Sequence, residues 1–299
     1  MIAQKGSLRQ AASQLNLTPA AASIRLKQLE ADAAVKLFEH GPNKLTLTED
    51  GRVFLEQVQR ILEDLDNSLS LLHEKKGICA GSISVALGTD MTFFLAPAIA
   101  AFVKDNPLVR LSLLARPSPD VLGLVMRNQT DIGIGRYGSL PKTVKTIPLF
   151  RSGLVAIYPC GHPASLRRRL SLPDLASYEL ILLTSQSATR HAVNQVFFNN
   201  GLEIKTVIEA GSCFAIKEYV NLGLGVGLVH DTCMAGRNEA RLKMSDVSHL
   251  FGKSEIALIH RDKKNFSLAH ARFVEAITRM KNKFGPDKTK KERFLKGSI

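Results

Sequence analysis

SLRQAASQLNLTPAAASIRLKQLEADAAVKLFE, residues 7–39, is the stretch that decides the fold of the N-terminal part of the chain. Two short helical patterns meet there at the polar turn Asn16-Leu17. Ser7 can cap the first helix, and Thr18 offers the same hydroxyl cap to the second. Pro19 then stands at the first helical position, where its missing N–H costs nothing. The first helix is expected to share one apolar face among Leu8, Ala11, Ala12 and Leu15.

The second helix of this pair has two contrasting faces. Ala22, Leu26 and Leu29 follow the i, i+4, i+7 spacing of a buried face. The rest of the helix presents small, polar and basic residues, and such a face can enter the major groove of DNA. An ordinary helical hairpin with a solvated outer face is the alternative. The residues expected to meet DNA are Thr18, Pro19, Ala20, Ser23, Ile24, Lys27, Gln28 and, beyond this helix, Lys44.

A wing is expected directly after the hairpin. Residues 37–39 are interpreted as a helix end, residues 42–44 as a turn, and residues 45–51 as a short strand leading out. Lys44 would lie at the tip of this wing and contact the phosphate backbone. The wing therefore favours a DNA-binding domain over a plain hairpin.

The run AAS-x-LNLTPAAAS…LKQLE…LFE…LTLTEDG resembles the DNA-binding domain of LysR-type transcriptional regulators. The likeness holds at many positions in a fixed order, so it is more specific than a short motif. It implies a winged helix-turn-helix domain over residues 1–52 that binds double-stranded DNA.

Three departures from the family pattern affect this domain. Residues 1–5 correspond only to the last turn of a longer first helix, so we expect either a start assigned too late or a weakened core. Ala34 stands where the family has glycine, which favours a different helix exit. Ile24 replaces a polar or basic side chain, and it can contact at most a thymine methyl group.

Composition limits the classes of protein to consider. The 299 residues carry a formal net charge of +13, which favours an anionic partner, and 45% of them are hydrophobic, which supports globular cores. No apolar run reaches the roughly 18 residues of a membrane span, and the N-terminus has no signal-peptide pattern, so a cytoplasmic location is expected. The spacing of Cys79, Cys160, Cys213 and Cys233 predicts reduced packing thiols and neither a metal site nor a cofactor.

A long amphipathic helix is predicted over residues 52–76. At 1.5 Å per residue it would be about 37 Å long, more than a small winged domain can cover. We therefore interpret residues 53–76 as a dimerisation helix, with packing within its own domain as the alternative. The resemblance implies the same, together with a homodimer or homotetramer. Residues 77–81 would be a hinge. The apolar positions expected in the dimer interface are Phe54, Val58, Ile61, Leu65 and Leu72.

The pattern changes to alternating strands and helices from residue 82. Apolar strands with helical crossovers predict a parallel α/β sheet. Strands are expected at 82–88, 110–115, 130–135, 154–158, 179–183, 205–209, 225–229 and 255–260. Helices are expected at 92–104, 119–127, 190–198, 214–222 and 265–284. The order resembles the two-lobed effector-binding domain of the same regulators, itself similar to type 2 periplasmic binding proteins. Lobe I would comprise about 82–153 and 260–284, and lobe II about 154–259, followed by a basic, solvated tail at 285–299.

The ligand of such a domain is expected between the lobes, at the carboxyl ends of the strands. Hydroxyls and helix N-termini there suit a small anion, and Arg136 could add a bidentate clamp. For each hydroxyl a helix cap is the alternative, and Asp90 could simply pair with Arg136. The expected effector-binding residues are Thr89, Asp90, Pro117, Ser118, Arg136, Thr184 and Ser185.

These patterns leave three functions to consider. The first is a DNA-binding regulator switched by a small molecule. An enzyme is disfavoured because no catalytic constellation can be defended, and the loop at residues 223–227 precedes a strand where a dinucleotide loop would follow one. An exported solute-binding protein is opposed by the N-terminal winged domain. A cytoplasmic small-molecule-binding protein, impaired in DNA binding by its shortened N-terminus, is the alternative to the first.

Overall fold

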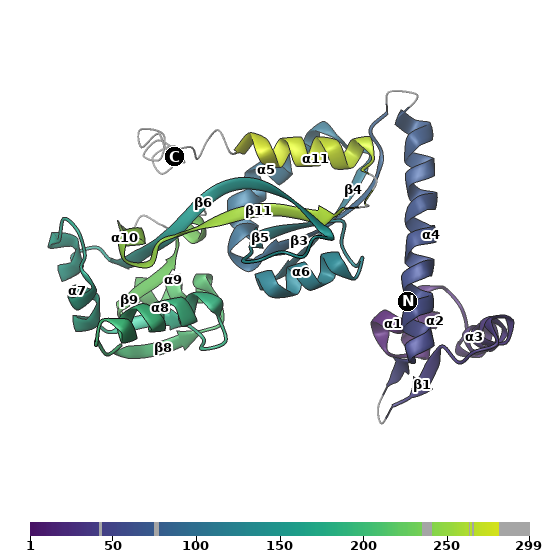
Figure 1. Ribbon diagram of the computed structural model, residues 1–299, viewed down its shortest axis with the longest axis horizontal. Coiled ribbons are helices and arrows are strands. Elements are labelled where there is room, and N and C mark those ends of the chain that lie inside the picture. The colour runs from purple at the N-terminus through teal and green to yellow at the C-terminus, as the bar shows by residue number, and fades with distance from the viewer. Residues whose placement is uncertain (42–43, 75–77, 235–240, 263, 265, 281–299) are drawn as a thin grey trace. The chain divides into compact units, whose positions relative to one another are not determined.

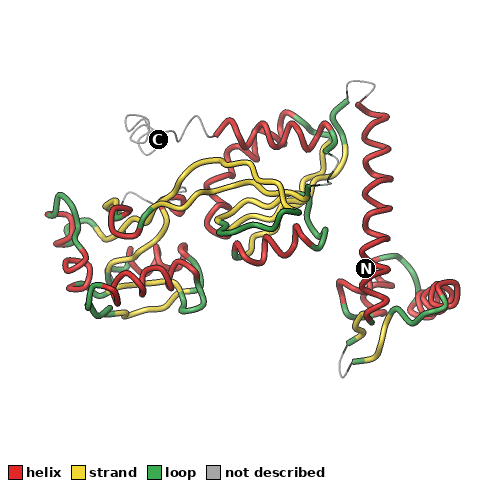
Figure 2. Tube along the Cα trace, in the orientation of Figure 1, coloured by secondary structure: helices red, strands yellow, loops and turns green. Residues whose placement is uncertain are grey.

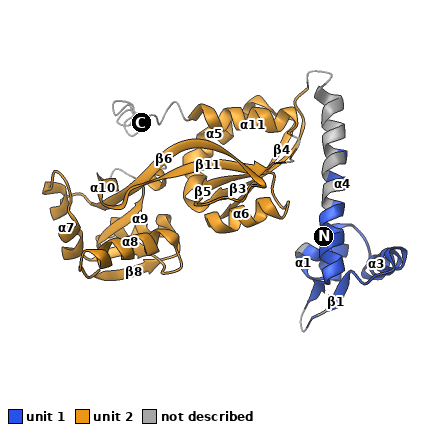
Figure 3. Ribbon diagram, viewed as in Figure 1, with its two compact units in different colours: residues 1–68 blue, residues 69–299 orange. Residues whose placement is uncertain are grey.

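The computed structural model covers residues 1–299 and describes residues 1–41, 44–74, 78–234, 241–262, 264 and 266–280. The chain divides into two compact units, residues 1–68 and 69–299 (Figure 3). Among the described residues, no helix combines the length and apolar character that a membrane crossing requires.

The first unit is the expected helical hairpin with a wing (Figure 1). Ser7 accepts a hydrogen bond from the Gln10 amide at 3.4 Å, and Thr18 accepts one from the Ala21 amide at 3.1 Å, so both predicted caps are confirmed. Its elements are α1 (Ile2–Lys5), α2 (Leu8–Gln14), α3 (Pro19–Ala33), β1 (Phe38–His40), β2 (Leu45–Leu47) and α4 (Glu49–Glu74).

The core of this unit is smaller than the apolar pattern predicts. Ala11 and Ala12 are fully buried, but Leu15 is 49% and Leu29 is 40% exposed, so their expected burial is wrong. Glu30 takes the buried place beside Leu29, and only 8% of it is exposed. Its carboxylate accepts hydrogen bonds from the amides of Leu37 and Phe38 at 2.9 and 3.2 Å. These hydrogen bonds to the backbone allow the Glu30 carboxylate to be buried, and Leu29 faces outward.

Three further expectations for this unit are corrected by the structure. Residues 38 and 39 are not a helix end, because β1 pairs antiparallel with β2, Phe38 opposite Leu47. The long helix begins at Glu49 and not at residue 52. Gly51 lets the first turn of this helix lie close to the Leu37 backbone, since a Cβ at residue 51 would lie 2.0 Å from the Leu37 carbonyl oxygen. Ala34 does adopt the left-handed conformation of the usual glycine, with φ 56°, so the helix exit is kept. The predicted turn at residues 42 and 43 lies outside the described residues.

The second unit is built on one nine-stranded sheet, drawn in yellow in Figure 2. The strand order is β4-β3-β5-β11-β6-β9-β7-β8, and β10 also pairs with β6. The strands are β3 (Gly81–Gly88), β4 (Val109–Arg116), β5 (Ile132–Arg136), β6 (Val144–Pro159), β7 (Leu180–Leu183), β8 (Thr206–Ala210), β9 (Val226–His230), β10 (Leu242–Asp246) and β11 (Lys253–Arg261). Strand β6 pairs with β11 through residue 153 and with β9 from residue 154, so this single strand passes from lobe I into lobe II.

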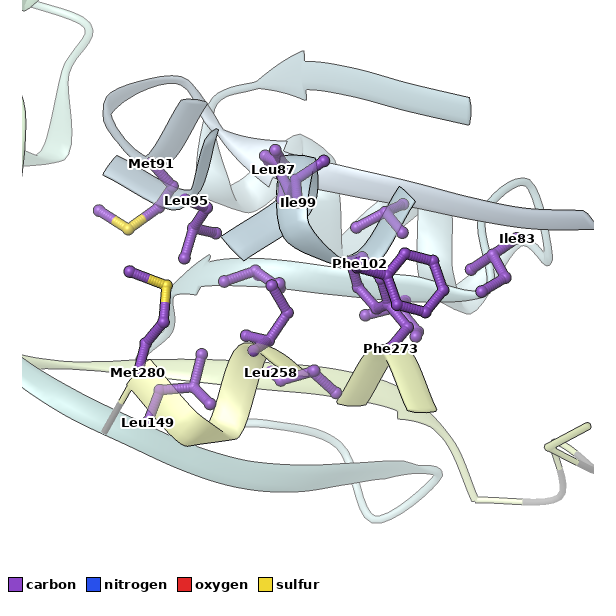
Figure 4. Close-up of a cluster of buried hydrophobic side chains, with 14 of the residues drawn as sticks. Ile83, Leu87, Met91, Leu95, Ile99, Phe102, Leu149, Leu258, Phe273 and Met280 are labelled. Atoms are coloured by element: carbon purple, nitrogen blue, oxygen red, sulfur yellow. The ribbon is translucent and has the colours of Figure 1, made fainter. Parts of the chain in front are cut away.

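Lobe I packs helices on both faces of its sheet. Helices α5 (Thr92–Asp105) and α11 (Leu268–Thr278) lie on one face and α6 (Ser118–Met126) on the other (Figure 1). The buried side chains of β3 meet those of α5 and α11, where Phe102 and Phe273 form an edge-to-face pair with ring centroids 5.1 Å apart (Figure 4). The predicted helix at 265–284 is shorter, because α11 ends at Thr278.

In lobe II, strand β6 is apolar on both sides because it lies between two hydrophobic cores. Leu154, Ala156 and Tyr158 enter one core, and Val155 and Ile157 enter another on the opposite face. The helices of this lobe are α7 (Leu172–Ser177), α8 (Ala188–Asn199), α9 (Cys213–Asn221) and α10 (Ser248–Phe251), with short 3₁₀ turns η1 (Thr89–Met91), η2 (Pro163–Leu166) and η3 (Asp231–Met234) elsewhere in the unit. Strand β10 and helices α7 and α10 were not predicted, since they are short and only partly apolar. The crossing strand is also longer than expected and begins at Val144.

Candidate DNA-binding surface and effector site

The outward face of α3 presents the residues that the sequence pattern selects. Ile24 is 69% exposed, and Lys27 and Gln28 are exposed beside it. Ser23 is half-buried, whereas Thr18, Pro19 and Ala20 are exposed at the helix start. Gln28 donates a hydrogen bond to Asp32 at 2.9 Å, which engages its amide nitrogen within the helix.

Two basic residues flank this face. Lys44 is exposed on the wing, and the amide of the next residue, Leu45, donates to the Gly6 carbonyl at 2.8 Å, which ties the wing to α1. Arg25 is also exposed on α3, one residue after Ile24. Sequence reasoning missed Arg25, although its charge and its place in the helix were signals for it. The unit therefore offers a helix face with cations from two elements, as contact with a duplex requires.

The apolar stripe on α4 is partly uncovered. Ile61 is 65%, Leu62 55% and Leu65 55% exposed, while Phe54 and Val58 are half-buried. The side chain of Leu72 lies outside the described part of the helix. Exposed leucine and isoleucine at neighbouring turns of one helix suit a partner helix.

The carboxyl ends of the lobe I strands bring three of the expected effector residues together. Arg136 ends β5, and its amide donates to the Ser118 hydroxyl at 3.1 Å. Its guanidinium Nη1 forms an ion pair with Asp90, which follows β3 in η1. This pairing was the alternative left open by the sequence, and it occupies the guanidinium that the sequence suggested as an anion clamp.

Ser152 at the end of lobe I and two residues of lobe II complete this cluster. Arg136 Nη2 donates to Ser152 at 2.8 Å and to Thr232 at 3.3 Å, and Thr232 donates to Asp90 at 3.0 Å. Ser152 also donates to Asp231 at 2.6 Å. Sequence reasoning missed Ser152, Asp231 and Thr232; the signal for the last two was a polar pair directly after a buried strand.

The positive charge of Arg136 affects the pKa values of two neighbouring groups. Burial raises the pKa of Asp90, but the attraction of the Arg136 guanidinium outweighs it and holds that pKa below its usual range. Burial and the positive charge of Arg136 lower the pKa of His230, which ends β9, to about 3. At neutral pH Asp90 is therefore ionised and His230 is neutral.

The remaining expected effector residues show no side-chain bond to this cluster. Thr89 is half-buried in η1, and its carbonyl accepts the Thr92 hydroxyl at 3.1 Å. Pro117 is exposed at the start of α6. Thr184 is half-buried and Ser185 exposed after β7, and the first turn of α8 reaches the cluster through Thr189, whose hydroxyl lies 3.2 Å from His230 Nε2.

The helices that start at this site have uncapped N-termini. No side chain caps the first turn of α5, α6 or α8, as is also the case for α11. By contrast, serine or threonine caps α2, α3, α7 and α9. Amides at a helix N-terminus without a side-chain acceptor can bind an oxyanion.

Two family models match the chain. The model described as the LysR substrate binding domain matches residues 80–281, and the bacterial regulatory helix-turn-helix protein model of the lysR family matches residues 1–52. The chain is 32% identical over 256 residues to the transcriptional regulator CysB of Burkholderia cenocepacia, covering 85% of this chain and 82% of that protein. It is 29% identical over 259 residues to the regulator Cbl of Escherichia coli, with coverage of 85% and 82%.

Solved structures agree with the fold. Full-length CbnR in complex with its target DNA matches with a TM-score of 0.65 at 22% identity, covering 93% of this chain and 96% of that one. The cofactor-binding domain of the Cbl regulator matches with a TM-score of 0.60 at 27% identity, covering 73% of this chain and 95% of that domain.

Proposed function

This chain belongs to the LysR family of bacterial transcriptional regulators, and from that premise we propose how it reads DNA and what switches it. It is a DNA-binding regulator with an effector-binding domain and not an enzyme. We place it in the cytoplasm, where its DNA partner lies. Helix α3 enters the major groove of each half-site, and Lys44 on the wing contacts phosphate.

The exposed face of α3 carries this proposal. Ser23 and Ile24 would set base preference, whereas Lys27 would add affinity for the backbone. A selection of bound duplexes from a random library, followed by gel shifts with the Ser23→Ala and Lys27→Ala variants, tests it. Unchanged affinity and unchanged sequence preference in both variants would remove α3 from the reading surface.

Dimers would form through α4, with the exposed positions Ile61 and Leu65 facing the same residues of a second copy. At about 1.5–3 kcal/mol for a fully buried large apolar side chain, several such residues suffice for a stable pairing. The effector domains would then join dimers into tetramers, the larger of the two assemblies expected for this family.

The effector would be a small anion bound between the lobes. The hydroxyls of Ser118 and Thr184, the uncapped N-termini of α6 and α8, and Arg136 support this choice. Arg136→Ala should abolish the effector response. Mass spectrometry of small molecules that copurify with the protein would identify the effector. A strictly cationic molecule would contradict the anion proposal.

A further inference from the structure

We propose that Asp90 is a built-in anion that occupies Arg136 and ties the two lobes together until an anionic effector takes its place. The proposal rests on the proposed function, because it names how that same site is regulated. An effector must then bind Arg136 more strongly than Asp90 does before it can act.

The first argument is the occupation of Arg136. Its Nη1 is paired with the Asp90 carboxylate, and its Nη2 is shared by Ser152 at 2.8 Å and Thr232 at 3.3 Å. Its Nε is buried and has no hydrogen-bond partner among the described residues. Three of the five guanidinium N–H groups are therefore engaged, and the Asp90 carboxylate neutralises the positive charge. An incoming anion can pair with the full charge of Arg136 only when Asp90 leaves it.

The second argument is the way Asp90 spans the lobes. The Asp90 Oδ2 atom that pairs with Arg136 of lobe I also accepts the Thr232 hydroxyl of lobe II at 3.0 Å. Beside it, Phe93 on α5 meets Phe214 on α9 edge to face, with centroids 4.6 Å apart. One carboxylate oxygen therefore joins groups from both lobes at a place where the lobes touch.

The third argument concerns the consequence of exchange. An incoming carboxylate would reproduce the bond to Arg136, but it would not be attached to η1 as Asp90 is. Replacement would separate Asp90 from Thr232 and loosen the lobes. A ligand shifts a conformational equilibrium only when it binds two arrangements unequally. Here the anion would bind the arrangement in which Asp90 has left Arg136 and not the one in which Asp90 occupies it.

Chemical rescue and an interlobe distance test the proposal on the full-length protein. Cys160 is the exposed cysteine of lobe II, and Cys79, Cys213 and Cys233 are buried. A Lys104→Cys substitution on the exposed end of α5 would complete a spin-label pair, measured by pulsed electron resonance after dilution with unlabelled protein. The Asp90→Ala variant should show a shifted interlobe distance without any ligand.

Formate is the probe for the vacated arginine, because it matches the carboxylate that Asp90→Ala removes. Sodium formate should raise the melting temperature of Asp90→Ala by several degrees relative to sodium chloride at equal ionic strength. The wild type and the double variant Asp90→Ala/Arg136→Ala should show no such rise. Asp262→Ala, which breaks an exposed ion pair with Lys145 in the same lobe, is the matched control and should change neither measurement.

Two results would overturn the proposal. If Asp90→Ala binds formate but keeps the wild-type interlobe distance, the ion pair does not tie the lobes. If Asp90→Ala does not bind formate, Asp90 does not occupy the place of an anion. If Asp90→Ala does not fold, Thr232→Val keeps the ion pair and removes the hydroxyl. It should shift the distance without creating formate binding, and an unshifted distance would again refute the tie. The proposed function fails separately, if no small molecule alters operator affinity of the wild type.

Discussion

Replacing Glu30 by alanine should detach the wing from the reading helix. The carboxylate receives the amides of Leu37 and Phe38, and these would be left without an acceptor. An unsatisfied buried amide costs about 1–3 kcal/mol, so two of them give about 2–4 kcal/mol when one is partly solvated. The ion pair with Lys36 adds little, because that lysine is 76% exposed. Loss of the wing position should weaken operator binding, since Lys44 would no longer be held beside the duplex.

Hydrogen exchange followed by mass spectrometry measures this effect directly. A loss of about 2–4 kcal/mol corresponds to roughly 30- to 700-fold faster exchange of the two amides, if β1 opens locally. Glu30→Gln is the control: Leu37 and Phe38 both donate to the one oxygen Oε1, and a glutamine carbonyl oxygen can accept both amides, so little acceleration is expected. Wild-type exchange rates at Leu37 and Phe38 in Glu30→Ala would refute the reasoning.

Three further changes test other parts of the molecule. Lys27→Ala should lower the salt slope of operator binding by about 1, as seen in gel shifts at several salt concentrations, if this lysine meets a phosphate. Leu65→Asp should give smaller species in light scattering and lose operator binding, whereas Leu65→Met should keep the assembly. The lowered pKa of His230 means that the unfolded chain takes up a proton first, so stability should fall by about 1.4 kcal/mol per pH unit from about pH 6.5 toward pH 3. In His230→Gln, denaturant unfolding at each pH should show a flatter profile.

Much of the first unit could be predicted because its signals are local. A serine or threonine at the N-cap accepts a hydrogen bond from the backbone amide three residues later, which marks the start of a helix. Ser7 and Thr18 both do so. The burial of Glu30 could not be predicted, because its partners lie seven and eight residues away at the start of the wing, whose position depends on the tertiary fold. Spacing alone favoured Leu29 for the same place.

The cluster around Arg136 could be predicted in part for the same reason. Asp90, Ser118 and Arg136 follow strands that the sequence marks clearly, and the rule for the carboxyl ends of parallel strands brings them together. Ser152 and Thr232 were missed because they come from an antiparallel crossing strand and a 3₁₀ turn, which no periodicity identifies. Whether Arg136 faces a ligand or Asp90 depends on a contact between residues 46 positions apart in the chain, and the sequence left that choice open.

The most direct test of the whole account is the affinity of the full-length protein for its selected operator, measured by fluorescence anisotropy with and without the copurifying small molecule. The account predicts that the molecule changes the Kd by about 5- to 150-fold, the range of a coupling of about 1–3 kcal/mol, and that Arg136→Ala removes the change. An operator Kd that is the same with and without the bound molecule would contradict it.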